Sequence, residues 1–155
     1  MTIIETLLKA KEYYEKGVTC TLRFHNLTKN FLNFDSIGNI KDFEAATPPP
    51  LFIKPDSFGD AILNASKFWS STLNLFYTIK VNDKLYAIHI NYIWEKETKG
   101  SIQIKILDIN GDTLYPQKEN FVGLYKSFEI NEKSIPFVIN YMASGSFVEV
   151  LIREK

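Results

Sequence analysis

Few side chains in this sequence are of the types that carry out catalysis or bind metal ions. The chain has two histidines, His25 and His89, and one cysteine, Cys20. Each of them lies in a run of alternating apolar and polar residues, where a structural position on a strand is the simplest interpretation. The sequence contains no metal-site spacing of histidines or cysteines, no Gly-x-Ser-x-Gly motif and no glycine-rich phosphate loop. We therefore expect a binding protein without a cofactor, not an enzyme.

Aromatic residues are more informative. They make up 14% of the chain. Tyr92 and Trp94 end an alternating run, directly before the charged stretch EKETKG, and Tyr115 and Tyr125 lie in or near a later irregular region. Rings in such places can present an apolar face and a polar edge to a membrane interface or to a sugar. We expect these four rings, together with His89, to form a lipid or glycan head-group site; filling of the core is the alternative use of each ring.

Length and charge limit the class of protein. The chain has 155 residues, which fits one domain over 1–155, and its 18 basic residues balance its 18 acidic residues. No basic face for nucleic acid is expected from such a balance, and membrane binding would have to use aromatic side chains and head-group pockets. A single cysteine excludes an internal disulfide. Neither a secretory signal nor a run of about 18 apolar residues is present.

The sequence predicts a helix over residues 1–17. Thr2 and Glu5 have the spacing of a capping box, and Gly17 is a typical residue at a helix end. Apolar residues recur at helical spacing and give the helix one apolar face: Ile3, Ile4, Leu7, Leu8 and Tyr14. Charged residues line the opposite face.

From Val18 onward the period of the pattern changes to 2, which predicts strands. The clearest hairpin joins two alternating runs through Asn82 and Asp83, and Tyr86, Ile88 and Ile90 are expected in the core. Residues 38–50 are expected to form a long irregular connection, and residues 116–128 a short helix or a loop. Many short strands with turns about every ten residues predict a mainly β fold, an antiparallel β-sandwich over 18–155 that carries the N-terminal amphipathic helix.

Several stretches resemble the actinoporin-like pore-forming cytolysins and their relatives, the fungal fruit-body lectins. VTCTLRFHNLTKNFLNF resembles the first strand of that family with its Asn-x-Thr turn, here Asn26 to Thr28. PPPLFIKPDSFGDAIL resembles its extended segment, with Ile53, Pro55 and Gly59 in place. LNLFYTIKVNDKLYAIHINYIW resembles its central hairpin, and GSFVEVLI its last strand.

The resemblance implies recognition of a lipid head group, phosphocholine in actinoporins, beside the exit of the central hairpin. Tyr92 would match a head-group tyrosine, and Tyr125 a tyrosine of the small second helix. His89 and Asn91 stand where the family has a serine and a proline, and KETKG replaces an aromatic loop. These differences favour the lectin branch. Because the N-terminal residues show no secretory signal, we expect a protein made without a classical signal peptide, cytoplasmic or released. The family likeness implies action at target-cell membranes, with assembly into a homo-oligomer there as one option.

Pore formation would require the N-terminal helix to insert with its apolar face against lipid. Residues 2–16 span about 22 Å as an α-helix, whereas the apolar core of a bilayer is roughly 30 Å thick. A charged face could line a water-filled lumen, but a helix docked on a sheet would show the same face. Two functions therefore remain open: a cytolysin that inserts this helix, and a lectin-like module without lytic activity.

Overall fold

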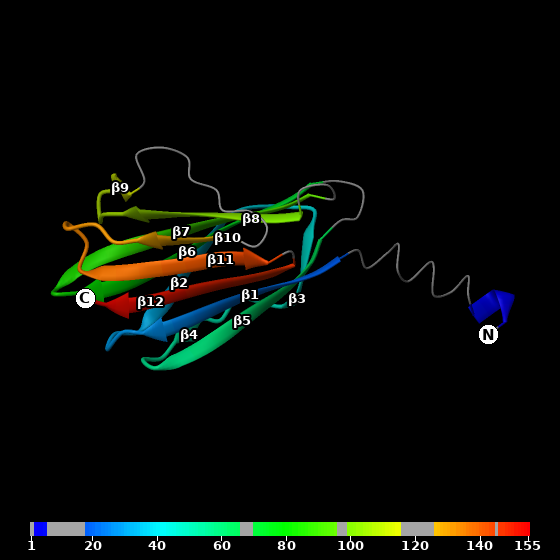
Figure 1. Cartoon of the computed structure of the whole chain (residues 1–155), viewed down its shortest axis with the longest axis horizontal. Helices are drawn as coiled ribbons and strands as arrows, with labels where there is room; N and C mark the ends of the chain where they lie inside the picture. The colour runs from blue at the N-terminus through cyan, green and yellow to red at the C-terminus, as the bar shows by residue number, and fades with distance from the viewer. Residues whose placement is uncertain (1, 6–17, 66–69, 96–98, 116–125, 145) are drawn as a thin grey trace.

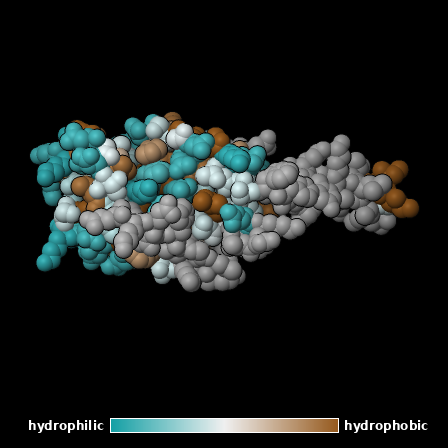
Figure 2. All heavy atoms as spheres, turned by 90° about the horizontal axis from the view of Figure 1, so that it is seen from above, coloured by the Kyte–Doolittle hydropathy of each residue, from teal (hydrophilic) through white to brown (hydrophobic). Residues whose placement is uncertain are grey.

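The computed structural model describes residues 2–5, 18–65, 70–95, 99–115, 126–144 and 146–155. They form two six-stranded sheets that pack face to face around one apolar core (Figure 1). The predicted mainly β sandwich is therefore confirmed. On the face seen in Figure 2, the described apolar residues form separate patches among hydrophilic ones.

The first sheet consists of β1 (Val18–Leu27), β3 (Phe43–Thr47), β5 (Ser57–Ala65), β10 (Lys126–Ile130), β11 (Phe137–Ser144) and β12 (Phe147–Glu154), in the order β10-β11-β12-β1-β5-β3. The second sheet consists of β2 (Leu32–Lys41), β4 (Phe52–Ile53), β6 (Ser71–Val81), β7 (Lys84–Glu95), β8 (Lys99–Leu107) and β9 (Thr113–Tyr115), in the order β4-β2-β6-β7-β8-β9. Neighbouring strands are antiparallel except β1 and β12, which are parallel. The expected antiparallel sandwich thus needs this one correction.

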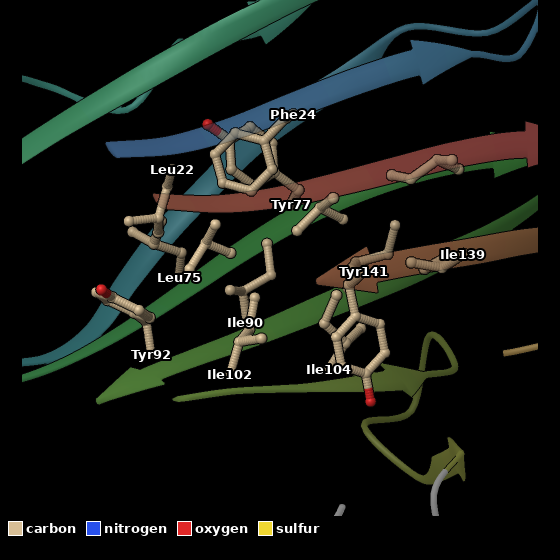
Figure 3. Packing of buried hydrophobic residues seen from close by; sticks show 14 of the residues in the cluster. Leu22, Phe24, Leu75, Tyr77, Ile90, Tyr92, Ile102, Ile104, Ile139 and Tyr141 are labelled. Atoms are coloured by element: carbon tan, nitrogen blue, oxygen red, sulfur yellow. The ribbon is translucent and has the colours of Figure 1, made fainter. Parts of the chain in front are cut away.

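The core consists of the residues that the alternating apolar pattern of the strands predicts to face inward. Tyr86, Ile88 and Ile90 are buried on the inner face of β7, and Cys20 is buried on the inner face of β1. Figure 3 shows side chains of the two sheets meeting between the layers. Burial raises the pKa of the Cys20 thiol to about 11, which keeps it in the unreactive protonated form at neutral pH.

The expectation that Tyr92 and Trp94 lie exposed at the end of β7 is wrong. Tyr92 is 0% exposed and Trp94 is 5% exposed. β7 pairs with both of its neighbours as far as Trp94, so the alternation continues inward to the end of the strand. The Tyr92 ring stacks on Phe43, with ring centroids 5.8 Å apart. Phe43 belongs to β3, a strand in the stretch that was expected to be irregular, and this strand supplies the missing cover.

The N-terminal helix is described only in its first turn, residues 3–5. The predicted capping box is present: the Thr2 amide donates to Glu5 Oε2 at 3.2 Å, and the Glu5 amide donates to Thr2 Oγ1 at 3.1 Å. Ile3 and Ile4 are exposed. Leu7, Leu8 and Tyr14 lie outside the described residues, so their apolar face stays a prediction. Within the described part of the chain, no helix has the length and apolar character needed to cross a bilayer.

Two buried tyrosines give a test of the core. The polar neighbour of the Tyr92 hydroxyl is the Cys20 thiol, a weak hydrogen-bonding group, and the hydroxyl has no stronger partner among the described residues. The Tyr77 hydroxyl donates to the Pro50 carbonyl at 2.8 Å. We expect Tyr92→Phe to leave the free energy of unfolding unchanged or to raise it, and Tyr77→Phe to lower it by about 1 kcal/mol. Urea unfolding measures both; equal losses in the two variants would contradict the assignment.

Candidate functional site

One end of the sandwich collects five of the connections between the strands. β1 ends there, and so does the parallel β12. Leu32, at the start of β2, pairs with Ile79 near the end of β6, which brings the β6–β7 hairpin turn to the same end. We call this the turn end; it is on the left in Figure 1. Its connections are residues 28–31, 54–56, 82–83, 108–112 and 131–136.

Four of the large apolar side chains exposed at the turn end lie on the β1–β2 turn and on the segment that enters β4, and we call these four the apolar tip. Leu27 and Phe31 are each 47% exposed, Phe52 is 52% exposed and Leu51 is 73% exposed. The Phe31 and Phe52 rings meet edge to face, with centroids 6.1 Å apart, although the two residues lie on different segments. Exposed apolar side chains gathered in this way are typical of surfaces that bind another molecule or a membrane.

The side chain of Asn26 holds the two segments of the tip together. It is fully buried, and its Nδ2 donates to the Asn30 carbonyl at 2.7 Å and to the Ile53 carbonyl at 2.9 Å. Its Oδ1 accepts from the Thr28 amide at 3.1 Å and from the Thr28 hydroxyl at 2.7 Å. One amide therefore shapes the β1–β2 turn and also ties that turn to β4 in the other sheet.

Pro50 anchors the second segment of the tip. Its carbonyl accepts the hydrogen bond from Tyr77, and the Leu51 carbonyl accepts one from the Phe34 amide at 2.9 Å. The Pro50 ring also lies against Gly59, where an added Cβ would stand 2.7 Å from Pro50 Cγ, so only glycine fits without displacement. The exposed side chains are thus held outward by a fixed backbone, which lowers the entropic cost of using them in binding.

Charges around the apolar tip are balanced. Lys29 and Lys54 are exposed beside it, and so is Asp56. The Glu154 carboxylate lies against the β1–β2 turn, where Oε1 accepts from the Lys29 amide at 2.6 Å. The apolar tip is therefore surrounded by charges of both signs, and this surface should not strongly attract a partner of either charge.

His89, a residue expected in the head-group site, lies on the opposite face of β7 from Tyr92. Its ring stacks almost parallel on Phe76, with centroids 4.5 Å apart, and Nε2 is 2.7 Å from Asn74 Oδ1. Burial lowers the pKa of His89, and the nearby positive charge of Lys105 lowers it further, so the neutral form is favoured at pH 7. This environment is that of a histidine held in a side-chain stack on the sheet.

The expected head-group residues do not come together. Tyr92 and Trp94 point into the core, and His89 points out of the second sheet. Tyr115 is half-buried on β9, with its ring 6.4 Å from that of Phe128. Tyr125 lies outside the described residues. The apolar tip was missed because its residues flank turns; the available signal was large apolar residues directly after NLTKN and after three prolines.

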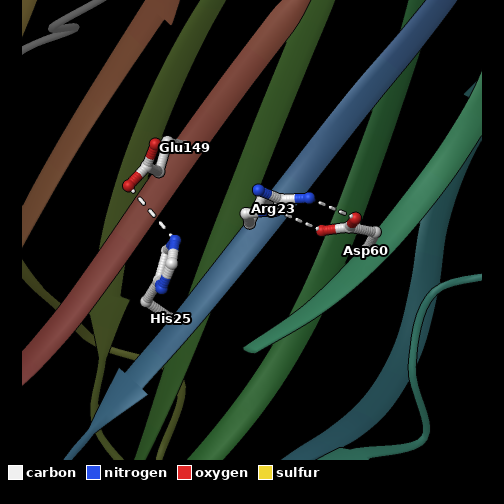
Figure 4. A network of polar contacts seen from close by, with 4 residues as sticks. All are labelled: Arg23, His25, Asp60 and Glu149. Atoms are coloured by element: carbon white, nitrogen blue, oxygen red, sulfur yellow. Dashed lines mark hydrogen bonds and ion pairs between the residues drawn. The ribbon is translucent and has the colours of Figure 1, made fainter. Parts of the chain in front are cut away.

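A polar cluster lies on the outer face of the first sheet (Figure 4). Arg23 donates from Nε and Nη2 to the two oxygens of Asp60, at 2.8 and 2.9 Å, and its guanidinium lies 4.7 Å from the centre of the Phe58 ring. His25 Nε2 lies 3.2 Å from Glu149 Oε1. The hydrogen bonds from Arg23 lower the pKa of Asp60. Among the described residues, no three histidines, cysteines or carboxylates gather to hold a metal ion.

Comparison with known proteins supports the architecture. No protein-family model and no curated protein matches the sequence. Among solved structures, the chain is similar to the lipid binding protein Nakanori, with a TM-score of 0.59 and 11% sequence identity; the match covers 98% of this chain and 78% of that one. At this identity the likeness establishes a shared β-sandwich fold.

Removal of the Asn26 side chain should loosen the apolar tip. Asn26→Ala would leave buried carbonyl and amide groups unpaired, and we expect the free energy of unfolding to fall by about 2–3 kcal/mol. Asn33→Ala, which changes an exposed asparagine on β2, is the control and should have little effect. Urea unfolding of the two variants is the measurement, and similar midpoints would show that Asn26 does not hold this end together.

Proposed function

We propose that this chain is a lipid-binding protein that docks on membranes through the apolar tip. The observation that carries the proposal is the pair of exposed rings, Phe31 and Phe52, fixed outward by buried hydrogen bonds. Rings on a rigid turn can enter the interfacial region of a bilayer without a change in fold.

The strength of such docking can be bounded. Burial of a Leu or Phe side chain contributes about 1.5–3 kcal/mol, and the tip side chains are roughly half-exposed, so each would gain roughly 1 kcal/mol. Four of them give on the order of 4 kcal/mol, which resembles the marginal, reversible anchoring by one acyl chain. The proposal is therefore reversible docking at the membrane surface.

The solved neighbour supports this proposal. Nakanori, which shares the fold, is named a lipid binding protein. A lipid binding protein with this architecture is consistent with the proposal, in which we assign the lipid contact of this chain to the apolar tip.

Lysis would be a further step. In a cytolysin, the N-terminal helix would insert after docking, on assembly of several copies. The capping box and the exposed Ile3 and Ile4 favour a helix that can present apolar side chains. Release of a trapped dye from vesicles separates a lytic protein from one that only docks, and deletion of residues 2–16 should abolish release without abolishing docking.

Mutation of the tip rings tests the docking. In co-sedimentation with liposomes made from a natural lipid extract, we expect the protein to bind, and Phe31→Ser with Phe52→Ser to weaken binding about tenfold or more, because two rings are lost. Ile37→Ser is the matched control, since Ile37 is 45% exposed on β2 and lies away from the tip. Because the charges are balanced, binding should change little between low and high salt.

Two results would count against the membrane proposal. One is the absence of binding to every lipid extract, and the other is equal loss of binding in the tip variant and in Ile37→Ser. Binding that disappears at high salt would mean that charge, and not the apolar tip, carries the contact.

A lectin-like module remains the second candidate, and the outer face of the first sheet favours it. Phe58 is exposed beside the Arg23–Asp60 pair, and an open pocket of about 140 Å³ lies on the neighbouring strands, with Asn140, Glu149 and Leu151 among its residues. An apolar floor with amide and carboxylate groups suits the two kinds of surface of a sugar ring.

A glycan array tests this alternative. If the outer face binds a sugar, Phe58→Ser should weaken the signal several-fold, and the tip variant should retain it. The Phe58 side chain is exposed, so its removal should not unfold the protein, and circular dichroism checks this. A glycan signal that survives Phe58→Ser would place sugar binding elsewhere.

A further inference from the structure

A second feature of the turn end is an open pocket of about 490 Å³, formed by residues other than those of the apolar tip. The β6–β7 turn and the start of β7 contribute Asp83, Lys84 and Leu85 to it. The β8–β9 connection and β9 contribute Asp108, Ile109 and Leu114. Its volume is in the range of sites that bind small organic molecules.

Two turns fix the shape of this pocket. Asn82 and Asp83 have φ angles of 53° and 63°, the left-handed conformation that closes a two-residue hairpin. Across the pocket, Asp108 Oδ1 accepts hydrogen bonds from the amides of Asn110 and Asp112, both at 2.9 Å. The walls are therefore preformed.

The lining combines apolar walls with an acidic rim. Ile109 is 75% exposed and Leu85 is 42% exposed, although both belong to ordered turns or strands. The charged groups are the carboxylates of Asp83 and Asp108 and the single ammonium of Lys84.

We propose that this pocket binds an organic ammonium compound, a small molecule with an apolar body and one cationic amine. The apolar body would lie against Leu85, Ile109 and Leu114, and would cover side chains that are now in water. The amine would lie between the two carboxylates. Asp108 Oδ2 accepts no hydrogen bond from the described residues, and Asp83 makes no ion pair with them, so both have acceptor capacity for an ammonium group.

Charge decides the class of ligand. Two carboxylates against one ammonium give the rim a net charge of −1, which attracts a cation and repels a carboxylate of the same size. This site does not depend on membrane docking, because its ligand can be a soluble molecule.

A matched series of probes tests the proposal. Hexylammonium, hexanol and hexanoate share one apolar chain and differ in charge. In NMR titrations at pH 7, we expect hexylammonium to bind most tightly and hexanoate least, with saturable shifts confined to the signals of the lining residues 83–86, 108–109, 114 and 134. Hexanoate binding as tightly as hexylammonium, or shifts spread over other surfaces, would overturn the proposal.

Variants separate the charge from the apolar contact. Asp83→Asn removes one charge and keeps the turn, since asparagine accepts the left-handed conformation. It should weaken hexylammonium binding about threefold and leave hexanol binding unchanged, as expected for one exposed charge pair. Ile109→Ser should weaken both probes, and Ile37→Ser neither. Unchanged hexylammonium binding in Asp83→Asn would overturn the assignment of the rim.

Discussion

The turn end of this protein depends on the buried side chain of Asn26. This polar side chain is fully buried. Its Nδ2 donates two hydrogen bonds and its Oδ1 accepts two, so burial leaves neither atom without a hydrogen bond. Because one of these partners is the Ile53 carbonyl, the bond joins β1 of one sheet to β4 of the other. Apolar packing between the two sheets has no preferred direction, whereas a hydrogen bond does. The two hydrogen bonds that Asn26 Nδ2 donates therefore fix the β1–β2 turn beside β4.

Much of the sandwich could be predicted from the sequence, because alternation reports directly which side chains of a strand face inward. The inner residues of β1 and β7 and the hairpin at Asn82 and Asp83 follow from that pattern. Contacts between distant segments do not follow from it. The parallel pairing of β1 with β12 joins the first and last strands, and no local pattern encodes such a pairing. Strand β3 was also missed, since its sequence lies next to prolines.

The candidate site was mislocated for the same physical reason. The end of an alternating run shows where a strand meets charged residues, but not whether a neighbouring strand covers its last rings. Phe43 covers Tyr92, and that contact exists only in the folded chain. Conversely, Phe31 and Leu51 flank turns in the sequence, yet the structure uses Asn26, Tyr77 and Gly59 to hold this region open to solvent. The Asn-x-Thr and glycine positions that resemble the cytolysin family thus act as supports beneath the exposed tip.

The two features of the turn end differ in what they can do alone. In the proposed docking, the apolar tip would contribute on the order of 4 kcal/mol, enough for a transient stay at a membrane but too little for stable anchoring. The pocket at the β6–β7 and β8–β9 turns offers charge and shape, which provide selectivity more than affinity. Both are held by turns at one end of the same rigid sandwich, so contact through one brings the other close to the same surface. A weak, unselective contact beside a selective pocket allows linked binding, in which the second contact gains from the high local concentration that the first creates.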